Sequence, residues 1–446
     1  MPKVRVLVLS TTTGYQLRAF DDAARALEHE LAFATDRCHR LDDPWRDRAI
    51  PVRFYDEPHS LGAIERAARA TPIDGVVAVG DRPVVLAALA AERLGLPGNP
   101  PPAARVTTSK FLMRESLDRA GLPVPWFVRV PAATAAGRAL DALRAVRLKP
   151  DITGAGLFPC VIKPLAMAAS RGVVRADDEE TFREAFERVQ ALLHRRDVRA
   201  QRNEWHGSIL IEGYIPGAEH ALEGVLHRGD LQALAMFDKP DPLSGPFFEE
   251  TIYLTPSRLD TAAQTLIVHT VAAACRAIGL RHGPIHAEAR VSDGRVYVLE
   301  VAARPIGGLC ARALRFVRGE AAGAGAGGTR LLSLEELLLL NAVGTPIRDY
   351  QREPRASGVM MIPVPRRGQF RRVEGLDAAR ALHGIEDIII TAKRDQMLVP
   401  LPEGSSYPGF IFSRGDSQDE VEAALRRAHA TLKWVVERPL DVLGQP

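Results

Sequence analysis

The sequence lacks the features that mark several large classes of protein. None of its apolar runs approaches the roughly 18 consecutive residues that a membrane-spanning helix needs. The four cysteines, Cys38, Cys160, Cys275 and Cys310, lie far apart, which excludes both a zinc-ligand spacing and a disulfide framework. Lysine plus arginine number 58 and aspartate plus glutamate 55, interleaved rather than blocked, so nothing predicts a nucleic-acid or membrane partner.

The start of the sequence does not have the pattern of a secretory signal. The opening stretch, residues 1–9, has a short apolar core interrupted by Arg5, and it lacks the longer apolar region that such a signal needs. We interpret it as the first buried strand of a cytoplasmic protein with reduced cysteines. The 446 residues are 46% hydrophobic and 25% charged, which is typical of globular chains and predicts two to four domains.

Strands and helices alternate near the start of the chain. The pattern predicts a strand at 4–10, a helix at 17–34, a strand at 73–79 and a helix at 84–94. This alternation favours a parallel α/β domain whose ligands bind beyond the carboxyl ends of the strands. The first turn is not GxGxxG, which argues against a dinucleotide site. The proline-rich stretch 96–102 marks a boundary.

The remaining chain mixes strands, hairpins and helices. We expect helices at 110–120, 179–195 and 262–278, strands at 160–164 and 209–212, and hairpins at 221–237 and 286–300. The glycine- and alanine-rich stretch 319–328 cannot bury apolar area, so we expect it to be poorly ordered and dispensable. Short strands and helices in 358–436 predict a smaller α/β lobe.

The hairpin at 286–300 carries two glutamates, Glu288 and Glu300, whose relative position depends on the turn. A two-residue turn at Asp293 and Gly294 would send them to opposite faces of the hairpin. A three-residue loop that includes Ser292 pairs 286 with 300 and 288 with 298, and it puts both glutamates on one face, about 7–8 Å apart at the backbone. We predict the three-residue loop, since two carboxylates on one face suit one or two hard cations. The alternative is a solvated hairpin with both glutamates in water.

The residues after the hairpin favour the metal site. Arg304 is in phase with Glu300, and the pair Gly307 and Gly308 would let the backbone approach a ligand. This is an unusual ending for an exposed edge. The glycines could instead serve only a tight turn.

Five segments carry a family resemblance. In chain order they are TTSKFLMRESLDRAGLPVP, CVIKPL, AMAASRGV, ILIEGYIPGAEHALEGVL and HAEARVSDGRVYVLEVAARPIGG. Together they resemble the ATP-grasp superfamily, in the form found in carboxylate–amine ligases such as the dipeptide-forming L-amino acid ligases. The resemblance implies an ATP-grasp fold of mixed α/β and α+β domains, with an N-terminal parallel α/β domain and a C-terminal lobe.

The resemblance also assigns residues to ATP. It implies that Lys110 and Lys163 contact phosphate oxygens and that Ser170, Arg171 and Gly172 cover the phosphates as a mobile loop. Glu212, Tyr214 and Ile215 would meet adenine, and Glu219 would accept hydrogen bonds from the ribose. The alternatives are that the lysines are ordinary surface residues, that the loop is a polar hairpin tip and that the two glutamates are solvated strand ends.

The implied chemistry is that of an ADP-forming ligase. Glu288 and Glu300 would hold Mg²⁺, which Mn²⁺ can replace, and Arg304 would be the catalytic residue that holds an oxyanion of an acyl phosphate. Glu250 and Tyr253 would line the substrate side of the site. The alternative is that they lie on a solvated strand edge. His286 is in phase with the glutamates, and we interpret it as a packing or supporting residue. Gly307 and Gly308 would lie on the substrate side, and Gly308 would form an open wall beside the point where carboxylate and amine meet.

Two departures from the family pattern keep other functions open. Ala302 stands where the family commonly has an asparagine metal ligand, and the loop over the phosphates is rich in alanine rather than glycine. These departures favour a non-catalytic nucleotide-binding regulatory protein, whereas Glu288, Glu300 and Arg304 oppose it. A purine-pathway or carboxylase-type enzyme is the other alternative, although no phosphosugar or bicarbonate motif is distinct.

The resemblance divides the chain into five segments. They are an N-terminal parallel α/β domain (1–105), a linker helix with the start of the ATP-grasp region (106–160), a small subdomain or nucleotide lid (161–220), a large subdomain with the metal site (221–350) and a C-terminal α/β lobe (351–446). It implies a small-molecule carboxylate and an amine as substrates, no nucleic acid and no membrane, and it is compatible with a homodimer.

Overall fold

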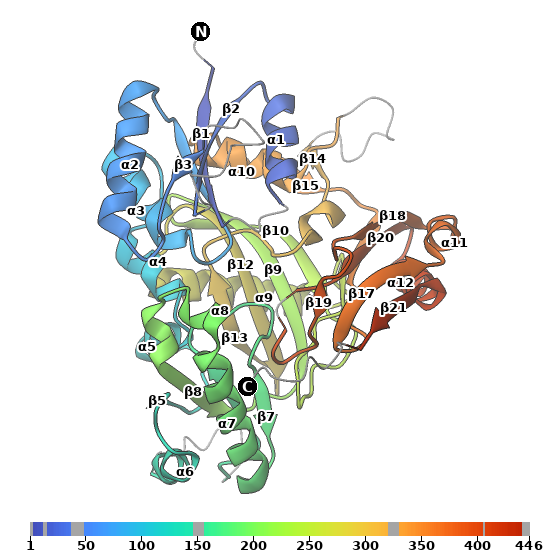
Figure 1. Ribbon diagram of the computed structural model, residues 1–446. Helices are drawn as coiled ribbons and strands as arrows, with labels where there is room; N and C mark the ends of the chain where they lie inside the picture. The colour runs from blue at the N-terminus through green and yellow to red at the C-terminus, as the bar shows by residue number, and fades with distance from the viewer. Residues whose placement is uncertain are drawn as a thin grey trace.

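In the computed structural model most of the chain forms three regions, each built around a β-sheet (Figure 1). The described residues are 3–11, 16–36, 49–145, 156–319, 330–404 and 406–438. Cys38 lies outside them, as do residues 320–328 of the glycine- and alanine-rich stretch, so the expectation of disorder in that stretch remains a prediction. None of the described helices has the length and apolar character that a bilayer-crossing helix requires.

The N-terminal region is a parallel α/β domain, as predicted. Its sheet has the order β3-β2-β1-β4, built from β1 (Arg5–Ser10), β2 (Glu30–Thr35), β3 (Ile50–Pro51) and β4 (Gly75–Val79), with parallel pairing throughout. The helices of this region are α1 (Leu17–Ala26), α2 (Glu57–Ala70), α3 (Val84–Leu94) and α4 (Pro101–Thr107). The central strands are buried on both faces, which explains their continuous apolar runs.

The helix predicted for 17–34 is wrong in its second half. It ends at Ala26, Glu28 has a φ of 57°, and residues 30–35 pair with β1 as strand β2. Alanine, leucine and phenylalanine in this stretch suit either state, so the pairing with β1 decides the outcome rather than the local sequence.

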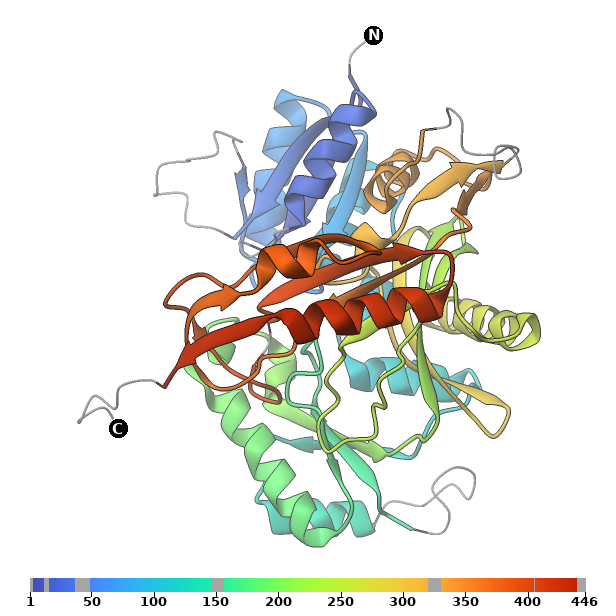
Figure 2. The same ribbon diagram turned by 90° about the vertical axis from the view of Figure 1, so that its right-hand side faces the viewer.

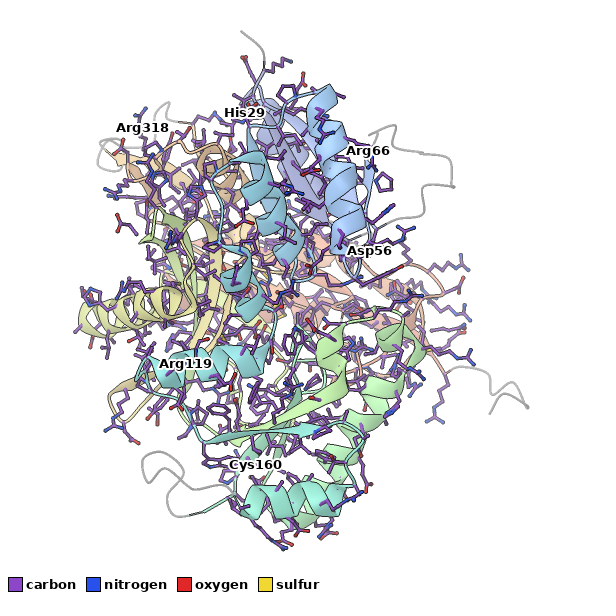
Figure 3. All side chains as sticks on the ribbon, turned by 90° about the vertical axis from the view of Figure 1, so that its left-hand side faces the viewer. His29, Asp56, Arg66, Arg119, Cys160 and Arg318 are labelled. Atoms are coloured by element: carbon purple, nitrogen blue, oxygen red, sulfur yellow. The ribbon has the colours of Figure 1, made fainter. Side chains whose placement is uncertain are left out.

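A small antiparallel sheet forms the lower region in Figure 1. It has the order β5-β8-β6-β7, built from β5 (Phe127–Pro131), β6 (Cys160–Pro164), β7 (Val174–Ala176) and β8 (Ser208–Gly213). Helices α6 (Ala136–Arg144) and α7 (Glu179–His194) share an apolar core with these strands. Cys160, labelled in Figure 3, begins β6; it is buried and free, as are Cys275 and Cys310.

The largest sheet is antiparallel and lies between the other two regions. Its eight strands have the order β13-β12-β9-β10-β11-β16-β20-β18. They are β9 (Ala218–His227), β10 (Asp230–Asp238), β11 (Ile252–Thr255), β12 (Gly283–Ser292), β13 (Arg295–Ala302), β16 (Ala356–Met361), β18 (Ile385–Ile390) and β20 (Gly409–Gly415). Helix α9 (Thr261–Ile278) packs near the β13 end, and α12 (Gln418–Thr431) packs on β16 and β20.

The C-terminal strands extend this large sheet and add a smaller one. A three-stranded sheet has the order β19-β17-β21, from β17 (Gly368–Glu374), β19 (Met397–Leu398) and β21 (Lys433–Glu437). Figure 2 shows this region with α12 in front. Helix α5 (Lys110–Arg119) packs on α4, α9 and β13, helix α10 (Leu334–Ala342) packs between the N-terminal domain and the large sheet, and the short α8 (Arg196–Arg199) packs on α7.

Candidate functional site

A cavity of about 530 Å³ lies where the three regions meet. Its walls include Gly80 and Asp81, which directly follow β4 at the carboxyl end of the parallel sheet, where ligands are expected. Nearly all residues singled out in the sequence line it: Lys110, Lys163, Ser170, Glu212, Tyr214, Ile215, Glu219, Glu250, Tyr253, His286, Glu288, Glu300, Arg304, Gly307 and Gly308. Residues from distant parts of the chain are therefore brought to one space.

The hairpin of β12 and β13 places Glu288 directly opposite Glu300. The predicted three-residue loop is wrong, because Ser292 pairs with Arg295 and the turn is the two-residue Asp293-Gly294, with φ of 49° and 71°. A β-bulge corrects the phase: the register shifts between Glu288 and Ala289, and the partner strand gains one unpaired residue there. The expectation that both glutamates share one face is correct, but the bulge produces it rather than the turn.

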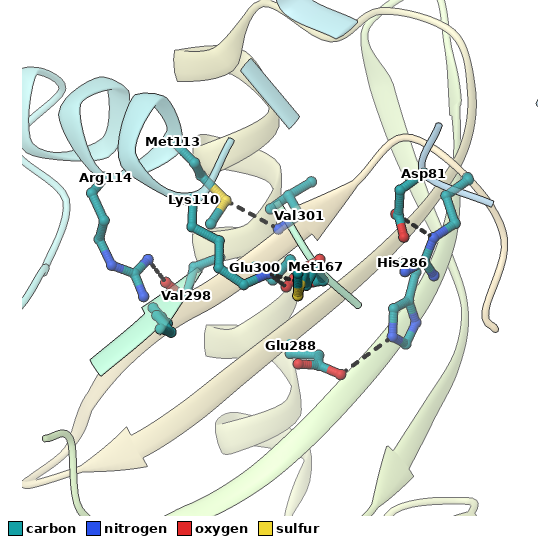
Figure 4. Close-up of polar contacts among 12 residues, drawn as sticks. Asp81, Lys110, Met113, Arg114, Met167, His286, Glu288, Val298, Glu300 and Val301 are labelled. Carbon is teal, nitrogen blue, oxygen red and sulfur yellow. Dashed lines mark hydrogen bonds and ion pairs between the residues drawn. The ribbon is translucent and has the colours of Figure 1, made fainter. Parts of the chain in front are cut away.

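Each of these two glutamates contacts a lysine. Glu300 Oε2 lies 2.5 Å from Lys110 Nζ, which also donates a hydrogen bond to the backbone oxygen of Met167 (Figure 4). Burial alone would lower the pKa of Lys110, but the Glu300 carboxylate outweighs burial and raises it. Lys110 therefore stays an ammonium that bridges α5, the loop after β6 and the hairpin.

Glu288 belongs to a cluster of three glutamates around Lys239, a residue that the sequence analysis missed. Lys239 Nζ lies 2.6 Å from Glu219, 2.6 Å from Glu250 and 3.1 Å from Glu288. The three carboxylates each have an oxygen within 4.8 Å of the others, which is a spacing that could hold a metal ion. Burial of Glu250 and the neighbouring carboxylates raise its pKa to about 7, even though Lys239 lowers it.

A second buried charge network underlies the lid side of the cavity. Arg114, which the sequence analysis also missed, is fully buried and donates from Nε to Glu212 Oε2 at 2.8 Å and from Nη1 to the Val298 oxygen at 2.9 Å. Lys163 contacts the other oxygen of Glu212. Glu212 is thus shared between two cations, and its carboxylate faces them instead of standing free for adenine.

The two partners of this network respond differently to burial. Burial would raise the pKa of Glu212, yet Arg114 and Lys163 lower it to about 2. Burial lowers the pKa of Lys163 to about 8, because one carboxylate offsets only part of the desolvation and Arg114 and Lys110 repel its charge. Glu212 is therefore ionised at neutral pH. Lys163 loses its proton only slightly above neutral pH, so a further anion beside it would stabilise its charged form.

Arg304 is held at the boundary between the hairpin and the N-terminal domain. Its Nε lies 2.8 Å from Asp81 Oδ1, and its Nη1 donates to the Pro305 oxygen. Burial opposes charge on both partners, but their mutual attraction keeps the pKa of Asp81 below and that of Arg304 above its usual value. Asp81 thereby positions a guanidinium at the cavity wall.

His286 lies between two glutamates. Its Nδ1 contacts Glu223, and its Nε2 lies 3.5 Å from Glu288. Burial would lower its pKa, but Glu223 raises it to about 9, so the ring is an imidazolium at neutral pH. A second oxygen of Glu223 accepts a hydrogen bond from the Ile306 amide, which ties the residues before Gly307 to β9.

The loop after β6 divides its predicted residues between two places. Ser170, with a φ of 52°, lines the cavity. Arg171 instead pairs with Asp197 at 2.7 Å and donates to the Glu403 oxygen, and it lines a neighbouring cavity of about 610 Å³. Gly172 donates its amide to the Pro402 oxygen. Arg171 and Gly172 therefore anchor the loop in this structure.

Aromatic and cationic side chains stack beside Tyr214. Its ring stacks on Phe248, with 6.4 Å between centroids, and the Arg175 guanidinium lies 4.4 Å from the Tyr214 centroid. Arg290 lies over both rings and donates to Glu219 Oε2 at 3.0 Å. Glu219 is thus paired with Lys239 and Arg290 rather than free to meet a ribose.

The glycine pair is not uniformly open. Gly308 has a φ of 63°, and an added Cβ would lie 3.0 Å from the Phe410 ring, whereas an added Cβ on Gly307 meets no atom within 4 Å. Gln16 donates hydrogen bonds to the Ile306 and Gly308 oxygens. The open wall predicted at Gly308 is therefore at Gly307, and Gly308 serves the turn.

This difference predicts opposite effects of alanine at the two positions. Gly308→Ala should lower the free energy of unfolding by about 1–3 kcal/mol, because alanine is strained at positive φ. Gly307→Ala should leave stability unchanged, since its Cβ would enter open space. Urea denaturation of both variants checks this, and equal losses would show that the turn needs both glycines.

Comparison with known proteins adds three family matches. Residues 20–98 match the ATP-grasp N-terminal domain, residues 157–313 match the ATP-grasp domain, and residues 360–437 match the L-amino acid ligase C-terminal domain 2. The first covers most of the parallel sheet, the second covers β6 to β8 of the small sheet and β9 to β13 of the large sheet, and the third covers the C-terminal strands. The cavity lies among residues of all three.

Individual relatives are distant. Carnosine synthase 1 of Gallus gallus is 32% identical over 255 residues, which are 55% of this chain and 26% of that protein. Alanine–anticapsin ligase of Bacillus subtilis strain 168 is 27% identical over 224 residues, 47% of this chain and 43% of that protein. The chain thus matches less than half the length of either relative.

A solved structure matches over nearly the whole length. The L-amino acid ligase from Bacillus licheniformis superposes with a TM-score of 0.78 at 26% identity, covering 98% of this chain and 100% of that one. The arrangement of the three regions is therefore similar to that of this ligase.

Proposed function

Because the chain is an ATP-grasp superfamily protein that resembles the L-amino acid ligases, we propose that it is an ADP-forming carboxylate–amine ligase. It would activate a carboxylate as an acyl phosphate and join it to an amine, with an amino acid as the preferred substrate class and a dipeptide-like amide as the product. The observation that carries this proposal is the convergence of Lys110, Lys163, Glu288, Glu300 and Arg304 on one cavity.

The residues present fit Mg²⁺ and ATP. Carboxylate oxygens are the ligands that Mg²⁺ prefers, and Glu288 and Glu300 present theirs side by side. Lys163 has only one carboxylate to offset its desolvation, so a phosphate oxygen would stabilise its charge. MgATP, when bound, supplies the phosphoryl group and much of the charge neutralisation.

The chain's own residues would bind, orient and exclude water. Lys110 on α5 and Lys163 on β6 supply positive charge to phosphate oxygens. Arg304, fixed by Asp81, would hold an oxyanion of the acyl phosphate or a substrate carboxylate. Gly307 leaves space at the same wall, which suits an incoming amine.

A screen of paired amino acids tests the proposal. The protein is incubated with MgATP and each pair, and ADP release and product mass are measured. We expect ADP release that depends on both amino acids, with an amide product. Turnover that depends on bicarbonate or a phosphosugar would favour a carboxylase-type or purine-pathway enzyme, and nucleotide binding without any turnover would favour a regulatory protein.

Nucleotide affinity should depend on pH through Lys163. Its pKa of about 8 means that the ammonium loses its proton as the pH rises through 8, and the attraction to phosphate is lost with it. The dissociation constant for ADP should therefore rise up to about tenfold per pH unit above pH 8. Calorimetric titration between pH 7 and 9.5 measures this, and Lys163→Arg, which stays charged, should show no such rise. Equal slopes in both proteins would contradict the role of Lys163.

A further inference from the structure

Lys239 is an almost completely buried charged group at the site. Its side chain is 2% exposed, and it does not line the cavity but lies beneath Glu219, Glu250 and Glu288, which do. It directly follows β10, which pairs with β9, the strand that carries Glu219. The three glutamates are thus held from below by one ammonium.

The contacts form a tripod. An ammonium has three N–H donors, and the Oε1 atom of each glutamate takes one position around Nζ, at 2.6, 2.6 and 3.1 Å. The remaining Oε2 atoms of Glu219 and Glu250 accept from Arg290 and from the Tyr253 hydroxyl. The Oε1 atoms of Glu219 and Glu250 face Lys239, and Glu288 Oε1 lies between Lys239 and His286 Nε2, which is 3.5 Å away.

Three carboxylate oxygens at this spacing are a ligand set for a divalent ion, and here a lysine occupies its centre. We propose that Lys239 takes the place of a divalent cation: its ammonium is a permanent counter-ion that closes the Glu219, Glu250 and Glu288 cluster to metal. Glu288 thereby keeps only its second oxygen for Mg²⁺, beside Glu300. Lys239 is a positioning residue, and its consequence for catalysis rests on the proposed ligase function.

Removal of Lys239 should create a metal site. In Lys239→Met the three carboxylates lose their cation, and free Mn²⁺ should bind there, in the absence of nucleotide, at least about tenfold more tightly than to the unaltered protein. Electron paramagnetic resonance of free Mn²⁺ measures the affinity and the number of sites. We expect one additional site in the variant.

Two controls separate a site from a general gain of negative charge. Lys163→Met removes a buried lysine that lines the same cavity but contacts only Glu212 among the carboxylates, and it should leave Mn²⁺ affinity unchanged. Lys239→Arg keeps the charge and should not gain the site. Equal Mn²⁺ affinity in the unaltered protein and in Lys239→Met, or an equal gain in Lys163→Met, would overturn the proposal.

The test remains decisive if Lys239→Met is unstable. The double variant Lys239→Met/Glu219→Gln is then compared with Glu219→Gln alone, so that one positive and one negative charge leave together. The double variant should bind Mn²⁺ more tightly and melt at a higher temperature when Mn²⁺ is added, and no difference would refute the proposal. Neither readout needs ATP or turnover, so a failed amino-acid screen would not contradict this inference. Likewise, a failed Mn²⁺ test would not contradict the proposed ligase function.

Discussion

Replacement of Glu300 by glutamine should reduce ADP formation at least about a hundredfold while the fold remains intact. Glu300 faces Glu288 across the hairpin and contacts Lys110. A neutral amide cannot balance a divalent cation, and it also leaves the Lys110 ammonium without its carboxylate. The loss should appear in turnover with every amino-acid pair that the unaltered protein uses.

A matched control comes from the same sheet. Glu386 in β18 has a similar exposure, 28% against 21%, and pairs with Arg315 and Arg414, away from the cavity. Glu386→Gln should retain ADP formation, and both variants should have melting temperatures near that of the unaltered protein. Near-normal ADP formation by Glu300→Gln would remove Glu300 from the metal site.

The sequence predicted most of the residues that line the cavity, because five segments in chain order resemble those of the ATP-grasp ligases. Lys163 lies near the end of the buried strand β6, and Lys239 directly follows β10, so the same signal, a lysine at the end of a strand, is present at both positions. Asp81 follows β4 at the carboxyl end of a parallel strand, which is also a recognisable position. Lys239 and Asp81 both lie just beyond the end of a strand, so the sequence contains a recognisable signal for each of them.

Other features depend on contacts that a single sequence does not encode locally. The bulge that aligns Glu288 with Glu300 sits between two ordinary strand residues, so a turn was the only visible way to set the register. Arg114 lies on α5 directly after an apolar run, and only the folded chain brings it to Glu212, 98 positions away. Arg171 stands in a segment that resembles a phosphate-binding loop. In the folded chain Asp197 and the Glu403 oxygen hold its side chain away from the cavity.

Loss of Arg114 should destabilise the protein more than loss of any surface arginine. Arg114 is fully buried, and Arg114→Met leaves Glu212 with Lys163 alone and the Val298 oxygen without its donor. Removal of one partner from a buried charge network costs about 3–5 kcal/mol, because the remaining charge is uncompensated. Urea denaturation at pH 7 measures this loss. Arg315→Met, which breaks an exposed pair with Glu386, should cost less than about 1 kcal/mol.

The pH dependence identifies the charge that is left behind. Glu212 has a pKa of about 2 in the folded chain against an ordinary 4.5, so its ion pairs stabilise the fold above pH 4.5, and this stabilisation is lost as the pH falls toward 2. In Arg114→Met the pKa of Glu212 should rise, and the difference in stability from the unaltered protein should shrink between pH 5 and pH 3. The double variant Arg114→Met/Glu212→Gln should lose less than the sum of the two single losses, since the two side chains contact each other. A constant difference across this pH range, together with additive losses, would show that Arg114 stabilises the protein by packing rather than through Glu212.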